Sequence, residues 1–264
     1  IGQLAGCLDQ GEFSIAIGNQ AGRINQTTYA VAIGQLAGYN AQGSKAVAIG
    51  DLAGCAGQGQ GCVAIGNAAA INAQGADAVA IGEASGCTDQ GVRSVAVGVH
   101  AARADQGDES VAIGAYAASN NQAAYSVAVG HDAARNGQGT KSVAIGLSAG
   151  LTSQGNQAVA VGDTAGSNAQ GQSSVAVGQI SGRASQGTYA VAVGYAAGCN
   201  VQGSKSVAIG YLAGCADQGT ESVAIGNNAG LDDQGTYAVA IGSSAARLDQ
   251  GTQSIAIGYV SGSD

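Results

Sequence analysis

Apolar residues along this chain follow a strict sixteen-residue period. Val or Ile, then Ala, then Val or Ile, then Gly recurs in every repeat without an insertion or deletion. Fifteen complete repeats cover residues 11–250, and partial repeats cover residues 1–10 and 251–264. Such a period is typical of repeat architectures, in which each unit buries its apolar side against its neighbours. We therefore expect a single continuous repeat domain over residues 1–264.

The alternation within each repeat predicts β-strands. Repeat positions are counted from the residue after the invariant Gln, so that Gly139–Gln154 is one complete repeat. Positions 5 to 7 alternate with the period of a strand, and Gly at positions 1, 8 and 12 permits turns. We expect one strand at about positions 3–8 and another at about positions 10–13. The predicted fold is all-β, a parallel β-solenoid or β-roll with one coil per 16 residues, two strands per coil and about 16.5 coils.

The invariant positions are predicted to stack as ladders on their copies in adjacent coils. Val143 and Ile145 lie on the same side of the first strand and are expected to form aliphatic ladders inside the coil. Gly146 follows them at a turn. The glutamines of position 16 are expected to form a structural amide ladder, represented by Gln138, Gln154 and Gln170.

The opposite side of the first strand carries only small residues, which is unusual for a solvated sheet face. Its columns are Ser or Ala at position 4, Ala at position 6 and Gly at position 8. A flat face of this kind suits close packing against a second copy of the chain, an ice lattice, or a sugar or mineral surface. Small residues that merely face water are the remaining alternative. The residues that represent this expected packing face are Ser142, Ala144, Ala160 and Ala176.

Composition and charge narrow the class of protein. The chain contains 46 Gly and no Pro, and it lacks the three-residue period of collagen. Its net charge of −8 with only nine basic residues argues against nucleic-acid binding. The chain contains no run of 18 apolar residues, so the sequence indicates no membrane-spanning helix. No nucleophile, base and orienting acid recur together, so we expect no enzymatic activity and no cofactor.

Cysteine and acidic columns supply the remaining candidate chemistry. Cys199 and Cys215 are the two cysteines on adjacent coils, where a Cα separation near ~4.8 Å permits a disulfide. For the other cysteines we expect free thiols or bonds between chains. Aspartates on three consecutive coils are a weak calcium candidate, and a solvated acidic edge is the alternative; they are Asp217, Asp233 and Asp249.

One N-glycosylation sequon occurs, at Asn25-Gln26-Thr27. It arises because Thr27 replaces the Gly found at position 1 of most repeats. Asn25 is therefore a candidate sugar site if the chain is secreted.

Ser-Val-Ala-Ile-Gly occurs at residues 110–114, 142–146, 206–210 and 222–226. This string resembles the head repeats of YadA-like trimeric autotransporter adhesins. The resemblance implies a left-handed parallel β-roll of which three chains pack into a head. It covers the whole chain through the pattern [SA]-[VI]-A-[IV]-G, which is about a third of each repeat, and it implies a place outside the cell.

The sequence therefore predicts a non-enzymatic, self-associating protein of an extracellular filament or of a cell or virion surface fibre. Association is expected through the flat small-residue face, through end-to-end stacking of coils, or through both. The competing predictions are an adhesin head or another module that binds a host or sugar surface, and an ice-binding protein. Ice binding is the weakest of these, because Thr recurs at position 2 in some coils only.

Overall fold

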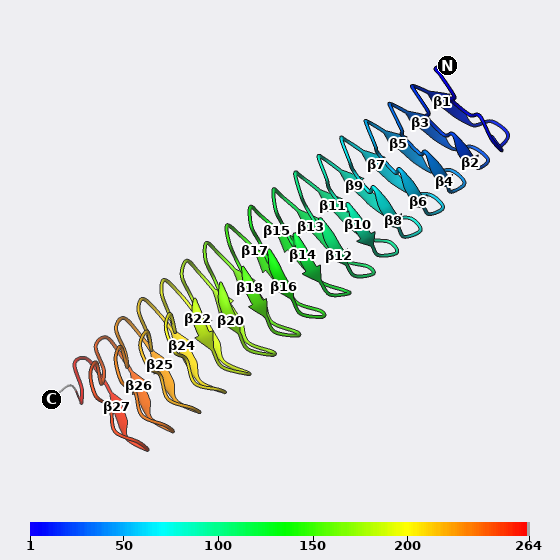
Figure 1. The fold of residues 1–264 in the computed structure, drawn as a ribbon. Helices are drawn as coiled ribbons and strands as arrows, with labels where there is room; N and C mark the ends of the chain where they lie inside the picture. The colour runs from blue at the N-terminus through cyan, green and yellow to red at the C-terminus, as the bar shows by residue number, and fades with distance from the viewer. Residues whose placement is uncertain (263–264) are drawn as a thin grey trace. The chain divides into compact units, whose positions relative to one another are not determined.

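A computed structural model describes residues 1–262, and the chain divides into two compact units, residues 1–132 and residues 133 onward. Each unit is a parallel β-solenoid whose strands pair in register with strands sixteen residues away (Figure 1). No helix occurs in the described residues. The predicted all-β parallel β-solenoid is confirmed, and the extent of one continuous domain stays a prediction.

The first unit contains two parallel sheets, each built from one strand per coil (Figure 1). Its first sheet has the order β1 (Ile15–Ile17), β3 (Val31–Ile33), β5 (Val47–Ile49), β7 (Val63–Ile65), β9 (Val79–Ile81), β11 (Val95–Val97), β13 (Val111–Ile113) and β15 (Val127–Val129). Its second sheet has the order β2 (Ile24–Gln26), β4 (Asn40–Gln42), β6 (Ala56–Gln58), β8 (Asn72–Gln74), β10 (Thr88–Gln90), β12 (Ala104–Gln106) and β14 (Asn120–Gln122).

The second unit repeats this arrangement, but its second sheet is shorter. Its first sheet has the order β17 (Val143–Ile145), β19 (Val159–Val161), β21 (Val175–Val177), β23 (Val191–Val193), β24 (Val207–Ile209), β25 (Val223–Ile225), β26 (Val239–Ile241) and β27 (Ile255–Ile257). Its second sheet has the order β16 (Asn136–Gln138), β18 (Thr152–Gln154), β20 (Asn168–Gln170) and β22 (Ala184–Gln186).

Where it forms, the second strand of a coil lies at positions 14–16, so its predicted place at positions 10–13 is wrong. Residues at positions 10 and 12 have left-handed backbone, such as Leu36 with φ 55° and Gly38 with φ 53°. Two left-handed residues so close together make this segment a turn. The chain therefore turns over positions 8–12 and again over positions 2–3.

Glycine at position 8 permits the close stacking of coils in the first sheet. Gly34 has φ 131°, a conformation that side chains other than glycine's rarely adopt. A Cβ atom built on it would lie 2.4 Å from the carbonyl oxygen of Gly50 in the next coil. The same contact recurs along both units, which explains why no other residue occupies this position.

The core of each coil is narrow and is filled by small side chains. Alanines at positions 6 and 11 are fully buried, as shown by Ala80 and Ala101 in the first unit and by Ala208 and Ala213 in the second.

In residues 1–262 no helix is long and apolar enough to span a membrane.

Candidate functional site

The two faces of the first strand are reversed relative to the prediction. Ser142, Ala144, Ala160 and Ala176, expected on an exposed packing face, are all 0% exposed and line the interior of their coils. Val143 is half-buried and Ile145 is 40% exposed, so the aliphatic ladders lie outside the coil.

The width of the coil explains this reversal. Residues at positions 4 and 6 point inward and face the turn at positions 8–12, which leaves room only for methyl and hydroxymethyl groups. A serine placed there satisfies its hydroxyl locally, because Ser142 Oγ donates to the carbonyl oxygen of Gly139 at 2.5 Å. Where Ala replaces it, no polar atom enters the core and no partner is needed.

The Val/Ile face consists of the position-5 and position-7 side chains on the outer surface of the first sheet. In the first unit Ile81 and Ile113 are 37% and 41% exposed, and in the second Ile209 and Ile225 are 38% and 36% exposed. Adjacent strands pair in register, so these side chains form continuous apolar columns in each unit. Contiguous apolar surface of this kind marks an interaction site on soluble proteins.

The buried glutamine side chains of position 16 form an amide column along the side of each coil that lies opposite the first strand. Gln154 Nε2 donates to the carbonyl oxygen of Val143 at 2.8 Å and to Oε1 of Gln170 at 3.1 Å. The same amide–amide bond joins Gln58, Gln74 and Gln90 in the first unit. The glutamines therefore tie one strand to the other within a coil and also connect neighbouring coils.

Aromatic and charged side chains of neighbouring coils pair in the turn columns. Phe13 and Tyr29 stack with ring centroids 5.1 Å apart, and Tyr195 and Tyr211 stack at 5.2 Å. Lys205 Nζ contacts a carboxylate oxygen of Glu221 at 3.1 Å. These exposed pairs contribute little stability individually, and they make the turns chemically varied.

The acidic column of the second unit distributes its carboxylates over separate coils. No group of three or more His, Cys, Asp or Glu in residues 1–262 is placed to hold a metal ion. Asp217, Asp233 and Asp249, the calcium candidates, are exposed and lie on separate coils. The pKa of Asp233 is raised, mainly by the charge of Asp232, then by a desolvation effect and by Asp217 and Asp249. The geometry therefore gives the calcium candidate no support, because these carboxylates repel one another without converging on one point.

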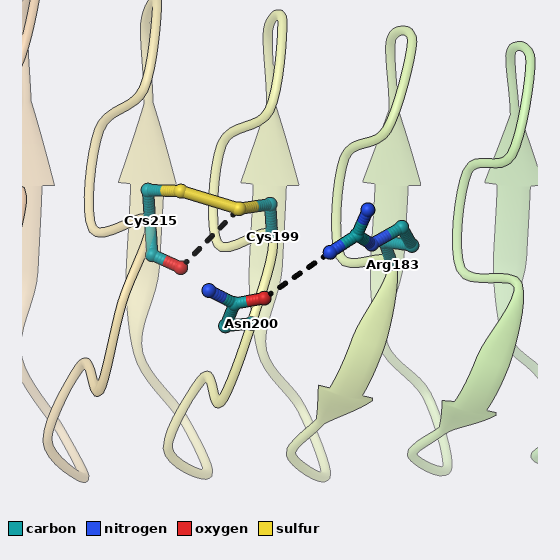
Figure 2. The surroundings of a disulfide bond; sticks show 4 residues. All are labelled: Arg183, Cys199, Asn200 and Cys215. Carbon is teal, nitrogen blue, oxygen red and sulfur yellow. Dashed lines mark hydrogen bonds between the residues drawn. A yellow bond between two sulfur atoms is a disulfide. The ribbon is translucent and has the colours of Figure 1, made fainter.

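Cys199 and Cys215 form a disulfide across adjacent coils, with their Cα atoms 4.8 Å apart (Figure 2). The other cysteines have free thiols in this structure. Cys62 takes the inward position 4, is fully buried, and donates from its thiol to the carbonyl oxygen of Gly75 at 2.7 Å. Burial raises the pKa of this thiol, which keeps it protonated.

The sequon is held in regular structure. Asn25 is an exposed residue of β2, and Thr27 Oγ1 donates to the carbonyl oxygen of Gln42 at 2.8 Å. Modification of Asn25 stays a prediction.

The family model for the YadA head domain repeat matches this chain in two overlapping copies, at residues 90–117 and 106–133. No curated protein matches the chain. The predicted resemblance to YadA-like head repeats is confirmed by these matches together with the parallel β-solenoid fold. The repeats thus indicate an adhesin-type surface β-solenoid.

The Val/Ile face was missed as a candidate surface because strand alternation separates two faces without saying which one points inward. One signal in the sequence could have decided it. Positions 4, 6, 11 and 12 are restricted to small residues in nearly every repeat, and these are the positions that meet inside the coil.

Proposed function

We propose that this chain is an adhesin-type surface protein whose copies associate through the Val/Ile face. The observation that carries the proposal is the continuous outer column of half-exposed Val and Ile in each unit. Burial of apolar surface is the main favourable contribution to the association of protein surfaces. The match to YadA head repeats supports the same assignment, and it favours display outside the cell.

A second copy of the chain is the partner that best fits this face. The columns repeat every coil at the spacing of paired strands, so an identical column on another copy presents ridges with the same spacing. The variable turn columns would remain exposed after association and would supply the contacts with a host or sugar surface.

The oligomeric state of the purified chain tests the proposal. We expect the parent chain to be an oligomer by analytical ultracentrifugation, and Ile81→Lys combined with Ile113→Lys to shift it to monomer. Lysine in the middle of an apolar interface is buried without a partner, which opposes association. The matched control is Tyr29→Lys, because Tyr29 is 54% exposed in a turn column where Lys45 occupies the equivalent position of the next coil.

A monomeric parent chain, or an oligomer that survives the isoleucine substitutions, would overturn association through this face. Electron microscopy separates the adhesin head from the filament expected on sequence grounds, since discrete particles support a head and long uniform fibres support a filament. Circular dichroism of the variants checks that loss of the oligomer is not loss of the fold.

A further inference from the structure

Two exposed tyrosines of the second unit stack on each other across adjacent coils. Tyr195 and Tyr211 both occupy position 9, directly after the invariant glycine, and they are 43% and 50% exposed. Their ring centroids are 5.2 Å apart, and the ring planes differ by 11°. The two phenol groups are therefore a solvent-accessible pair of identical chemistry, held side by side within one chain.

The backbone on both sides of the pair keeps the two tyrosines in register. The N–H of Gly210 donates to the carbonyl oxygen of Val193 at 2.9 Å, and the N–H of Leu212 donates to the carbonyl oxygen of Tyr195 at 2.9 Å. Equal positions of paired coils lie about 4.8 Å apart. The two rings can therefore meet edge to edge by rotation of their side chains, without movement of the backbone.

The composition of the second unit directs oxidation to its tyrosines. Thiols and thioethers are the side chains that common oxidants attack first. The chain has no Met and no Trp, and both cysteines of this unit, Cys199 and Cys215, are already joined in the disulfide. The free thiols all belong to the first unit. No thiol or thioether of the second unit therefore competes with tyrosine for an oxidant.

No other tyrosine of the second unit has a tyrosine at the same position of an adjacent coil. Tyr189 and Tyr237, at position 3, are three coils apart, and Tyr259 is three coils from Tyr211. Three coils correspond to roughly 14 Å, which is too far for a bond between rings. Tyr189 shares a coil with Tyr195 but lies at the other end of β23. Tyr195 and Tyr211 are thus the pair that this unit places within reach of each other.

We propose that Tyr195 and Tyr211 are a modification site, at which hydrogen peroxide acting through a haem peroxidase joins their rings as dityrosine. Each phenol loses one electron and one proton, and the two tyrosyl radicals couple through the carbons ortho to their hydroxyl groups. One C–C bond forms, and the hydrogen on each joined carbon moves to the oxygen, which restores both phenols. The peroxide takes up the two electrons and two protons and becomes two waters.

The product is a covalent link between adjacent coils that a thiol reductant does not open. It lies four residues before the disulfide that joins the same two coils. Because both tyrosines belong to one chain, the link does not depend on how copies of the chain associate. The inference therefore stands apart from association through the Val/Ile face.

Oxidation of the purified chain by a haem peroxidase and hydrogen peroxide tests the proposal. To prevent thiols from consuming the oxidant, the chain carries serine, which occurs in both cysteine columns, at Cys7, Cys55, Cys62 and Cys87. We expect dityrosine fluorescence, a monomer mass lower by two hydrogens, and a linked peptide pair that contains Tyr195 and Tyr211. A mixture of unlabelled and isotope-labelled chains identifies links within one chain, because each of these carries a single label.

Tyr195→Phe keeps a stacked ring but removes one phenol, so the link within the chain should be lost. Tyr189→Phe is the matched control, because Tyr189 is 55% exposed and has no tyrosine beside it in its column, and the yield should not change. Phe13→Tyr should add a second link, since Phe13 stacks on Tyr29 with ring centroids 5.1 Å apart.

Three results would overturn the proposal. They are a parent chain without the linked peptide pair, a yield that survives Tyr195→Phe, and a link that forms only between labelled and unlabelled chains.

Discussion

The second sheet is regular in one unit and interrupted in the other. In the first unit it runs from β2 to β14 with every strand paired, whereas in the second unit it stops at β22. The first sheet of that same second unit continues to β27. Beyond β22 the second side keeps isolated bridges, such as Gln186–Gln202 and Gln202–Gln218, so the coil tolerates less regular pairing on one side while the other side remains regular.

The difference follows from how strictly each sheet specifies its residues. Positions 5 to 8 accept only Val or Ile, Ala, Val or Ile, and Gly in every repeat. Positions 14 and 15 vary, and the second unit places Val201 and a run of aspartates there. The first sheet therefore contains the residues that are restricted in every repeat, and the second sheet tolerates sequence change.

The largest effect is expected from breaking the first sheet, which should cost more than any change in the second. In Gly50→Ala the new methyl group would lie 2.4 Å from the carbonyl oxygen of Gly66, on backbone with φ 131°. We expect the free energy of unfolding to fall by about 3 kcal/mol or more. Chemical denaturation followed by circular dichroism measures this loss.

Two glycines provide matched controls for this substitution. Gly258 has φ 128° but no atom closer than 3.8 Å to an added Cβ, so Gly258→Ala isolates the backbone strain. Gly251 has nothing within 4 Å, and its alanine variant should be neutral. If all three variants lost equal stability, close stacking of the coils would not explain the invariant glycine.

The buried amide column connects the two sheets, and its loss should be more costly where the second sheet is regular. Gln74 donates to the carbonyl oxygens of Val63 and Ala78 and to Oε1 of Gln90. We expect Gln74→Ala to cost about 3 kcal/mol, since it leaves buried carbonyls without a donor. Gln202→Ala, in the interrupted segment, should cost about half as much by the same measurement. Equal losses would show that the amide column acts independently of the second sheet.

The period, the strand type and the parallel in-register pairing could all be predicted from the sequence, because each depends only on the spacing of like residues. The inner face of the first strand could not. Both Val143 and Ala144 recur in every coil, and the choice between them depends on the interior width set by the turn at positions 8–12. That turn contains left-handed residues such as Leu36, which no residue preference reveals.

The candidate chemistry was predictable only where it depended on the spacing between coils. Cys199 and Cys215 could be paired because adjacent coils bring equal positions close together. The same spacing between coils places three aspartates in one column, Asp217, Asp233 and Asp249. Spacing alone, however, does not make their carboxylates converge on a cation. The interruption at Val201 depends on the backbone conformation of position 15, which is left-handed in almost every coil but not at Val201, and that became evident only from the structure.

A valine placed in the regular second sheet should reproduce the interruption seen in the second unit. Ala73 is an exposed residue of β8 with φ 52° at position 15. We expect Ala73→Val to lower stability by about 1 kcal/mol and to accelerate amide exchange in β8 and β10. Ala73→Asn is the matched control and should stay within about 0.5 kcal/mol of the parent. Unchanged exchange in the valine variant would mean that Val201 is not what ends the second sheet.

The smallest effect is expected from the aspartates that follow the interruption. The pKa of Asp233 lies above its ordinary value of 3.8 in the folded chain, with the neighbouring Asp232 as the largest cause. Folding therefore favours the protonated form of Asp233. Its contribution to the free energy of unfolding is complete below pH 3.8 and is lost as the pH rises through the raised pKa. Asp233→Asn should raise the thermal midpoint slightly at neutral pH and leave it unchanged in acid.

Added salt should reduce that difference, because exposed charges are screened within about 3 Å at 1 M ionic strength. Ser153→Asn, at the same position of a coil with a regular second strand, changes no charge and should show no dependence on pH or salt. Scanning calorimetry at neutral and acid pH resolves the two variants. A midpoint difference that persists in acid would assign the benefit of asparagine to its backbone preference at position 15, not to the removal of a charge.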